Sequence, residues 1–156
     1  MNVITGLAGI AAGLVSHLGT AGVLMGMILE SAGVPLSSEV IVPLGVLASN
    51  DVQGAGAVVT AGTIGNVIGS WIGYGVGVAI RRGWRGGRWL RRPHWEAAER
   101  WFNRYGDRAV LLGRLVPTVR TYISFPAGAA SMPAGRFTVY TAIGSLIWCA
   151  PLATTG

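Results

Sequence analysis

Long apolar blocks, separated by short polar or basic segments, dominate the pattern of this chain. Residues 54–80 contain no charged side chain, and residues 136–153 contain one charge, at their first position. A helix needs about 20 predominantly apolar residues to cross the hydrocarbon core of a bilayer. The pattern therefore predicts an all-α protein with membrane-spanning helices over these two blocks.

The apolar block over residues 20–50 is interrupted near its middle by Gly33 and Pro35. As a helix, each piece on either side is about 21 Å long, which is too short to span a bilayer. Runs of this length are typical of re-entrant segments, which enter the membrane and return to the same side. We therefore predict a helical hairpin over about residues 20–50, with its tip near Pro35.

Residues 107–133 repeat this pattern of two short apolar pieces around a break. Pro117 and Pro126 are the expected breaks, because proline removes a backbone donor and ends or kinks a helix. We predict a second helical hairpin over about residues 107–133, with its tip near Pro117.

The composition supports a membrane protein. Of the residues, 51% are hydrophobic and only 12% are charged, and the mean hydropathy is +0.54. A soluble domain carries about a quarter of charged residues. We therefore expect an integral membrane protein whose 156 residues form one domain, residues 1–156. Its first block, residues 3–20, fits either a short membrane helix or a helix lying at the interface.

Basic residues are concentrated in the second half of the chain. All twelve are arginines that follow residue 80, and residues 81–95 interleave six of them with three tryptophans. Because basic loops beside a span favour the cytoplasmic side and Trp favours the interface, we predict that residues 81–108 are cytoplasmic. Within residues 81–106, a basic loop is followed by an amphipathic surface helix that ends at Gly106. The pI near 10.7 also suits nucleic-acid binding, but the flanking apolar blocks favour lipid headgroups as partners instead.

This placement fixes an expected topology. With the Arg-rich loop in the cytoplasm, the span 54–80 places residue 51 outside the cell. The first hairpin must then enter from outside, and the second must enter from the cytoplasm. Their tips, near Pro35 and Pro117, would approach the midplane from opposite leaflets, as in transporters with inverted repeats.

Small and polar residues recur along one face of the expected span. Glycines occupy every fourth position, at Gly65, Gly69, Gly73 and Gly77. Small residues at this spacing allow another helix backbone to approach closely. Asn66 and Ser70 lie beside this stripe, where they can hydrogen-bond a neighbouring helix.

Two acids and two bases lie inside the broken apolar blocks: Glu30 and Glu39 in the first, Arg114 and Arg120 in the second. A charge at bilayer depth costs about 2.5–3.5 kcal/mol on insertion scales, so these groups are expected to meet in one pocket. Two interpretations remain open: the arginines bind an anionic substrate, or the ion pairs are structural clamps between the hairpins.

The same two segments carry sequence motifs. Residues 30–39 read ESAGVPLSSE, which resembles the motif E-S-x-G-x-P-x-P-[GS]-E of the DedA family, also called the VTT or SNARE-associated Golgi protein family. Ser37 and Ser38 replace its usual Pro and Gly. Residues 113–121 read GRLVPTVRT and are followed by PAG at 126–128, which is similar to the second family motif, G-R-[FH]-[IV]-P-x-[VI]-R-[TS].

The resemblance implies two opposed re-entrant hairpins in a bacterial cell membrane protein that transports a lipid phosphate, with undecaprenyl phosphate the leading substrate and H⁺ or Na⁺ as coupling ion. It assigns substrate binding and coupling to Glu30, Glu39, Arg114 and Arg120. Secondary candidates are Pro35, Pro117, Thr121 and Tyr122. Family members usually continue with a further C-terminal membrane helix, so we expect this chain to lack one.

Other functions stay as alternatives. A phospholipid scramblase or a small-oxyanion transporter would use the same charges, and a non-transporting assembly protein would use the glycine face. We do not expect an enzyme, a cofactor or a metal, because no His nucleophile or cluster of ligands accompanies the acids. A homo-oligomer is compatible with the sequence, which leaves the oligomeric state open.

Overall fold

The computed structural model describes residues 3–34, 36, 38–49, 52–83 and 100–154, and all regular structure in these ranges is helical. The helices are α1 (Val3–Leu18), α2 (Thr20–Ser31), α3 (Ser38–Ser49), α4 (Val52–Arg81), α6 (Arg108–Arg114), α7 (Pro117–Arg120), α8 (Ser124–Ala129) and α9 (Ala134–Ala153). Residues 100–105 are helical as well. The all-α prediction is confirmed.

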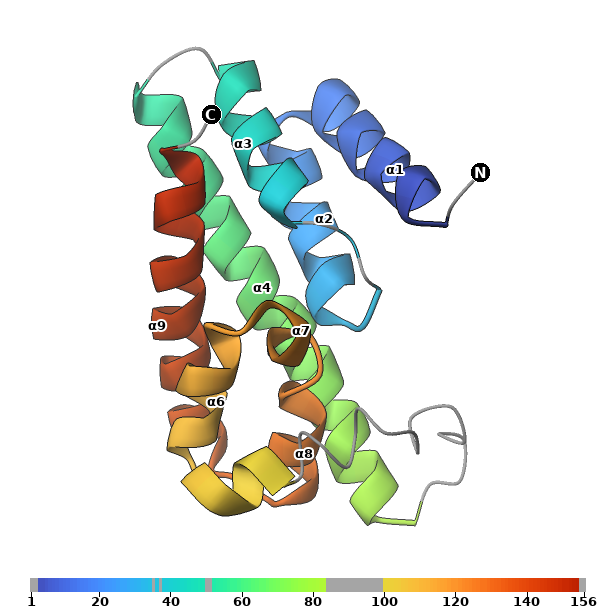
Figure 1. Ribbon diagram of the computed structural model, residues 1–156, viewed down its shortest axis with the longest axis vertical. Coiled ribbons are helices and arrows are strands. Elements are labelled where there is room, and N and C mark those ends of the chain that lie inside the picture. Colours follow the sequence, from blue (N-terminus) through green and yellow to red (C-terminus); the bar gives the residue numbers. More distant parts are fainter. Residues whose placement is uncertain (1–2, 35, 37, 50–51, 84–99, 155–156) are drawn as a thin grey trace.

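Helix α4 forms the centre of the bundle. It packs against α2, α3, α8 and α9. Figure 1 shows the α2–α3 pair beside one half of α4 and the α6–α8 segment beside the other half. Among the described helices, the stretch Gln53–Arg81 is long and apolar enough to cross a membrane. That α9 also crosses, and that the paired helices are re-entrant, stay predictions.

The break in the first apolar block lies where Gly33 predicts it. Helix α2 ends at Ser31, and Gly33 adopts a φ of 111°, a conformation that L side chains rarely adopt. Helix α3 then begins at Ser38 and packs back against α2. Pro35, the expected tip, lies outside the described residues.

The second block is more fragmented than the sequence suggests. Val116 is extended, as expected for a residue before proline, and Pro117 starts the single turn of α7. The expected break at Pro126 is wrong, because Pro126 lies in the first turn of α8, where its missing N–H is not needed. The actual second break is the turn over residues 121–123.

The glycine stripe of α4 contacts both halves of the bundle, α2 in one and α8 in the other. A Cβ added to Gly69 would lie 2.3 Å from the carbonyl oxygen of Ile28 in α2, and one added to Gly77 would lie 2.0 Å from that of Phe125 in α8. Both distances are too short for any side chain, so the predicted close approach of helices to this face is confirmed. The stripe thereby brings α2 and α8 onto one side of α4.

The predicted surface helix also ends where expected. Gly106 adopts a φ of 58°, and its N–H donates to the carbonyl of Phe102 at 2.8 Å. Asp107 then pairs with Arg136 at the start of α9, with 3.0 Å between Oδ2 and Nη1. The rest of the predicted basic loop, residues 84–99, lies outside the described residues.

Candidate functional site

Among the described residues, three charged side chains are buried where the two halves of the bundle meet. Glu30 near the end of α2 is 5% exposed, Arg114 at the end of α6 is 2% exposed, and Arg120 at the end of α7 is 4% exposed. Arg114 lies close enough to the other two for their charges to act on it. We call these three side chains the buried charge cluster.

Glu30 and Arg120 form an ion pair between the two hairpins. Nη2 of Arg120 donates to Oε1 of Glu30. The Arg120 guanidinium also lies over the indole of Trp148 in α9, with its Cζ 5.0 Å from the ring centroid. Trp148 in turn donates from Nε1 to the hydroxyl of Ser38 at 3.3 Å. The aromatic face thus holds the cation on one side while the carboxylate neutralises it on another.

Arg114 differs from Arg120, because its partners are neutral. Its Nη1 donates to Oδ1 of Asn66 at 3.1 Å, and its Nη2 donates to the hydroxyls of Ser70 and of Ser124, the latter at 3.0 Å. Among the described residues, no carboxylate pairs with Arg114. Helix α9 approaches this side chain closely at Gly144, where an added Cβ would lie 2.7 Å from the Arg114 Cβ.

Asn66 connects the polar groups of four helices. Its Oδ1 accepts from Arg114 and from the hydroxyl of Ser31 in α2, and its Nδ2 donates to the hydroxyl of Ser145 in α9 at 2.6 Å. The expectation that Asn66 and Ser70 hydrogen-bond a neighbouring helix is confirmed. Since each link is made between buried groups, the network fixes the position of Arg114 relative to α2, α4 and α9.

Several atoms of the buried charge cluster have no hydrogen-bond partner among the described residues. They are Oε2 of Glu30, Nε of Arg114 and Nη1 of Arg120. Buried polar atoms in folded proteins are nearly always hydrogen-bonded. Two unused guanidinium N–H donors in one buried cluster suit an anion with several oxygen acceptors, such as a phosphate.

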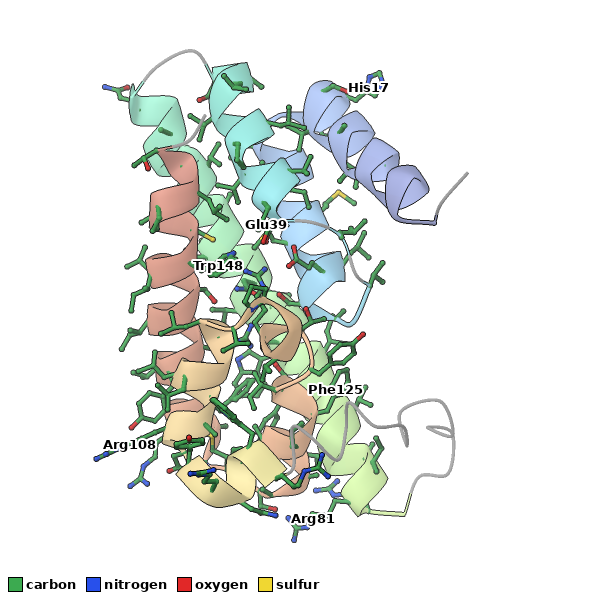
Figure 2. All side chains as sticks on the ribbon, viewed as in Figure 1. His17, Glu39, Arg81, Arg108, Phe125 and Trp148 are labelled. Atoms are coloured by element: carbon green, nitrogen blue, oxygen red, sulfur yellow. The ribbon has the colours of Figure 1, made fainter. Side chains whose placement is uncertain are left out.

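Glu39 does not join this cluster, contrary to the expectation that four charges share one pocket. It is exposed and forms no ion pair with a described arginine. Its neighbour Ser38 is buried against Trp148, and one residue further along a helix turns a side chain by about 100°. The start of α3 at Ser38 therefore directs Glu39 outward; Figure 2 labels it on α3.

Of the four secondary candidates, Pro35 lies outside the described residues, and the other three follow Arg114 along the chain. Pro117 is exposed at the start of α7, and Thr121 and Tyr122 are half-buried in the turn that follows it. Ser124, one of several hydroxyl residues in this segment, is fully buried and contacts Arg114. Trp148 was not predicted from sequence as part of the site. It lies five residues before the end of the apolar block 136–153, where a tryptophan is ordinary because Trp favours membrane interfaces.

The described part of the chain is all-helical, with buried charges and one helix that is long and apolar enough to cross a membrane. The VTT domain family matches residues 34–156, and the chain belongs to that family, the DedA family of the two sequence motifs. An alkaline phosphatase-like protein of Lactococcus lactis subsp. cremoris is 32% identical over 153 residues, covering 92% of this chain and 72% of that protein.

Two further relatives have names that bear on location or cargo. Undecaprenyl phosphate transporter A of Bacillus subtilis is 32% identical over 141 residues, covering 85% of this chain and 68% of that protein. An uncharacterized membrane protein of Mycobacterium tuberculosis is 36% identical over 129 residues, covering 77% of this chain and 59% of that protein. No solved structure matches the chain.

Proposed function

We propose that this chain transports a lipid phosphate across a bacterial cell membrane, with undecaprenyl phosphate as its substrate, and that Arg114 and Arg120 bind the phosphate. The observation that carries the proposal is the charge of the buried cluster. Two guanidiniums and one carboxylate sum to one excess positive charge, in a place where charge is costly. One bound phosphate anion would balance it.

Arginine chemistry supports a phosphate as the ligand. A guanidinium keeps its charge under all physiological conditions and binds phosphate oxygens through two parallel N–H donors. Arg114 and Arg120 each retain a buried donor with no described partner. A relative of similar sequence is named for undecaprenyl phosphate transport, which points to the same class of lipid.

Glu30 supplies a means of coupling transport to an ion. While ionised, it neutralises Arg120; once protonated, or bound to Na⁺, it would release the guanidinium for substrate. A membrane potential of 100 mV contributes about 2.3 kcal/mol for each charge moved, which is enough to bias direction. Glu39, being exposed, is a candidate for exchanging protons with the surroundings of the site.

The expected topology completes the proposal. The two hairpins enter from opposite leaflets and residues 81–108 lie in the cytoplasm, so that the buried charge cluster is reached alternately from each side. The competing proposal is that the Glu30–Arg120 pair is a structural clamp without ligand contact.

A leaflet-resolved flux assay in proteoliposomes tests this function. Labelled undecaprenyl phosphate should cross faster with the wild-type chain than with Arg120→Lys. Arg104 is an exposed arginine outside the site, so the control variant Arg104→Gln should transport at the wild-type rate. Equal flux of phosphatidylethanolamine would instead indicate a scramblase, and flux of inorganic phosphate an oxyanion transporter. Release of phosphate from the lipid would indicate an enzyme, and no flux at all would leave a structural protein.

A further inference from the structure

Two adjacent hollows lie at the C-terminal end of α4, away from the buried charge cluster. One is a half-enclosed, largely polar hollow of about 390 Å³, and the other is a wide, largely apolar groove of about 780 Å³. Val78 and Arg82 line both. Arg81 lies about 16 Å along the helix from Ser70, and neither hollow is lined by a residue of the buried charge cluster or by one of its hydrogen-bond partners.

The polar hollow carries two positive charges on a fixed wall. Arg81 and Arg82 line it together with Tyr74 and with Ser131, which follows α8 and adopts a φ of 59°. The Tyr74 hydroxyl donates to the carbonyl of Met132 at 2.6 Å, which ties this segment to α4. Both arginines are exposed, and no described acid pairs with either. The hollow therefore presents cations that remain available to an anion.

The groove next to it is apolar. It runs along the face of α4 formed by Ile72, Gly75, Val76 and Ala79, toward the middle of the helix. A Cβ added to Gly75 would meet nothing within 4 Å, so the missing side chain leaves open space there. A flexible hydrocarbon chain fits such a surface, which lies on a helix long enough to cross the membrane.

We propose that these two hollows form one binding site for an anionic membrane lipid, with its phosphate held by Arg81 and Arg82 and its chain lying along the groove. Arginines at the end of a spanning helix lie at headgroup depth, where basic pockets between helices bind lipid phosphates. The polar hollow alone suits a free phosphate, but the apolar groove that shares Arg82 with it requires a ligand with a tail. Figure 2 shows Arg81 and Arg108 at the same end of the bundle, which allows a matched comparison of charges.

The first experiment separates a site from diffuse surface charge. Binding of dioleoyl phosphatidic acid to the purified chain is measured by native mass spectrometry, with dioleoyl phosphatidylcholine as the comparison lipid. Each interfacial arginine contributes about 1 kcal/mol toward an anionic lipid, so Arg81→Gln/Arg82→Gln should weaken binding about thirtyfold. Arg104→Gln/Arg108→Gln removes the same charge from the same end and should change binding little.

The second experiment separates a lipid from a free phosphate ion. Gly75→Leu fills the groove without touching the arginines, so it should weaken phosphatidic acid binding and leave inorganic phosphate binding unchanged. Gly56→Leu, at another open position of α4, should change neither. Arg120→Gln should leave this interfacial binding in place, so that failure here and failure of the central site are told apart.

Three outcomes would overturn the proposal. Equal weakening by both double arginine variants would mean that only general surface charge attracts the lipid. An unchanged phosphatidic acid affinity in Gly75→Leu would mean that the groove holds no chain and that the hollow takes a phosphate ion alone. Equally tight binding of phosphatidylcholine would mean that the arginines do not recognise the anionic phosphate.

Discussion

Removing either member of the Glu30–Arg120 ion pair should destabilise the protein, but by unequal amounts. Breaking a buried pair by deleting one partner costs about 3–5 kcal/mol, because it leaves an uncompensated charge. Both side chains are almost completely buried, so water does little to screen that charge. In a chain of this size, the loss corresponds to a decrease of roughly 10 °C in the midpoint of thermal unfolding.

The neighbouring Arg114 sets the order of the two effects. Glu30→Gln leaves two buried cations and no buried anion in the cluster, whereas Arg120→Gln leaves Glu30 beside the cation of Arg114. Glu30→Gln should therefore be the more damaging substitution. The double variant Glu30→Gln/Arg120→Gln has no broken pair, so its unfolding midpoint should recover most of the loss.

The wild type, the two single variants and the double variant are compared by thermal unfolding in detergent, with the folded fraction measured by size-exclusion chromatography. The flux assay is run on the same four samples. If the pair is only a clamp, the double variant recovers both stability and transport. If Arg120 binds substrate, stability recovers and transport does not. Two results would refute the reasoning: single variants as stable as the wild type, or a double variant whose loss equals the sum of the two single losses.

Three further predictions concern the surroundings of the site. Gly77→Ala places a Cβ against the backbone of α8 and should cost about 1–3 kcal/mol or more of stability by thermal unfolding, whereas Gly75→Ala, which meets nothing, should not. Trp148→Ala removes the aromatic face over Arg120 and should lower flux by an amount equivalent to about 0.5–2 kcal/mol. Trp148→Phe keeps an aromatic ring and should retain most of the flux, so equal losses in the two variants would contradict a cation–π role. Asn66→Asp gives Arg114 a carboxylate and should weaken phosphate binding at least about tenfold without loss of folded protein; unchanged binding would exclude Arg114 from the site.

The parts of the fold that local backbone chemistry determines were predictable from sequence. Gly33 ends α2 because of its positive φ. Pro117 keeps the preceding residue extended and starts α7. The glycine stripe of α4 allows the neighbouring helices to approach closely, as its spacing implies. Pro126 was misjudged, because whether a proline breaks a helix depends on where that helix begins. Helix α8 begins at Ser124 and packs on Gly77 of α4, a tertiary contact that the local pattern around Pro126 does not include.

The candidate site was predictable by residue type but not by pairing. A charge inside an apolar block must be compensated, so Glu30, Arg114 and Arg120 stand out in the sequence. Which acid meets which base depends on the rotation of each helix about its axis. Moving the first residue of α3 by one position would rotate Glu39 by about 100°, an accuracy that sequence patterns do not reach.

The contact of both hairpins with α4 through glycines has a mechanical consequence. Where Gly69 and Gly77 meet their neighbours, the backbone of α4 lies directly against the backbone of α2 and of α8. A slip of one hairpin by one helical residue along such a seam is only about 1.5 Å, and in α2 it would break the hydrogen bond from Ser31 to Asn66. The same close approach makes the seam intolerant of bulk, since even one methyl group at either glycine would obstruct it.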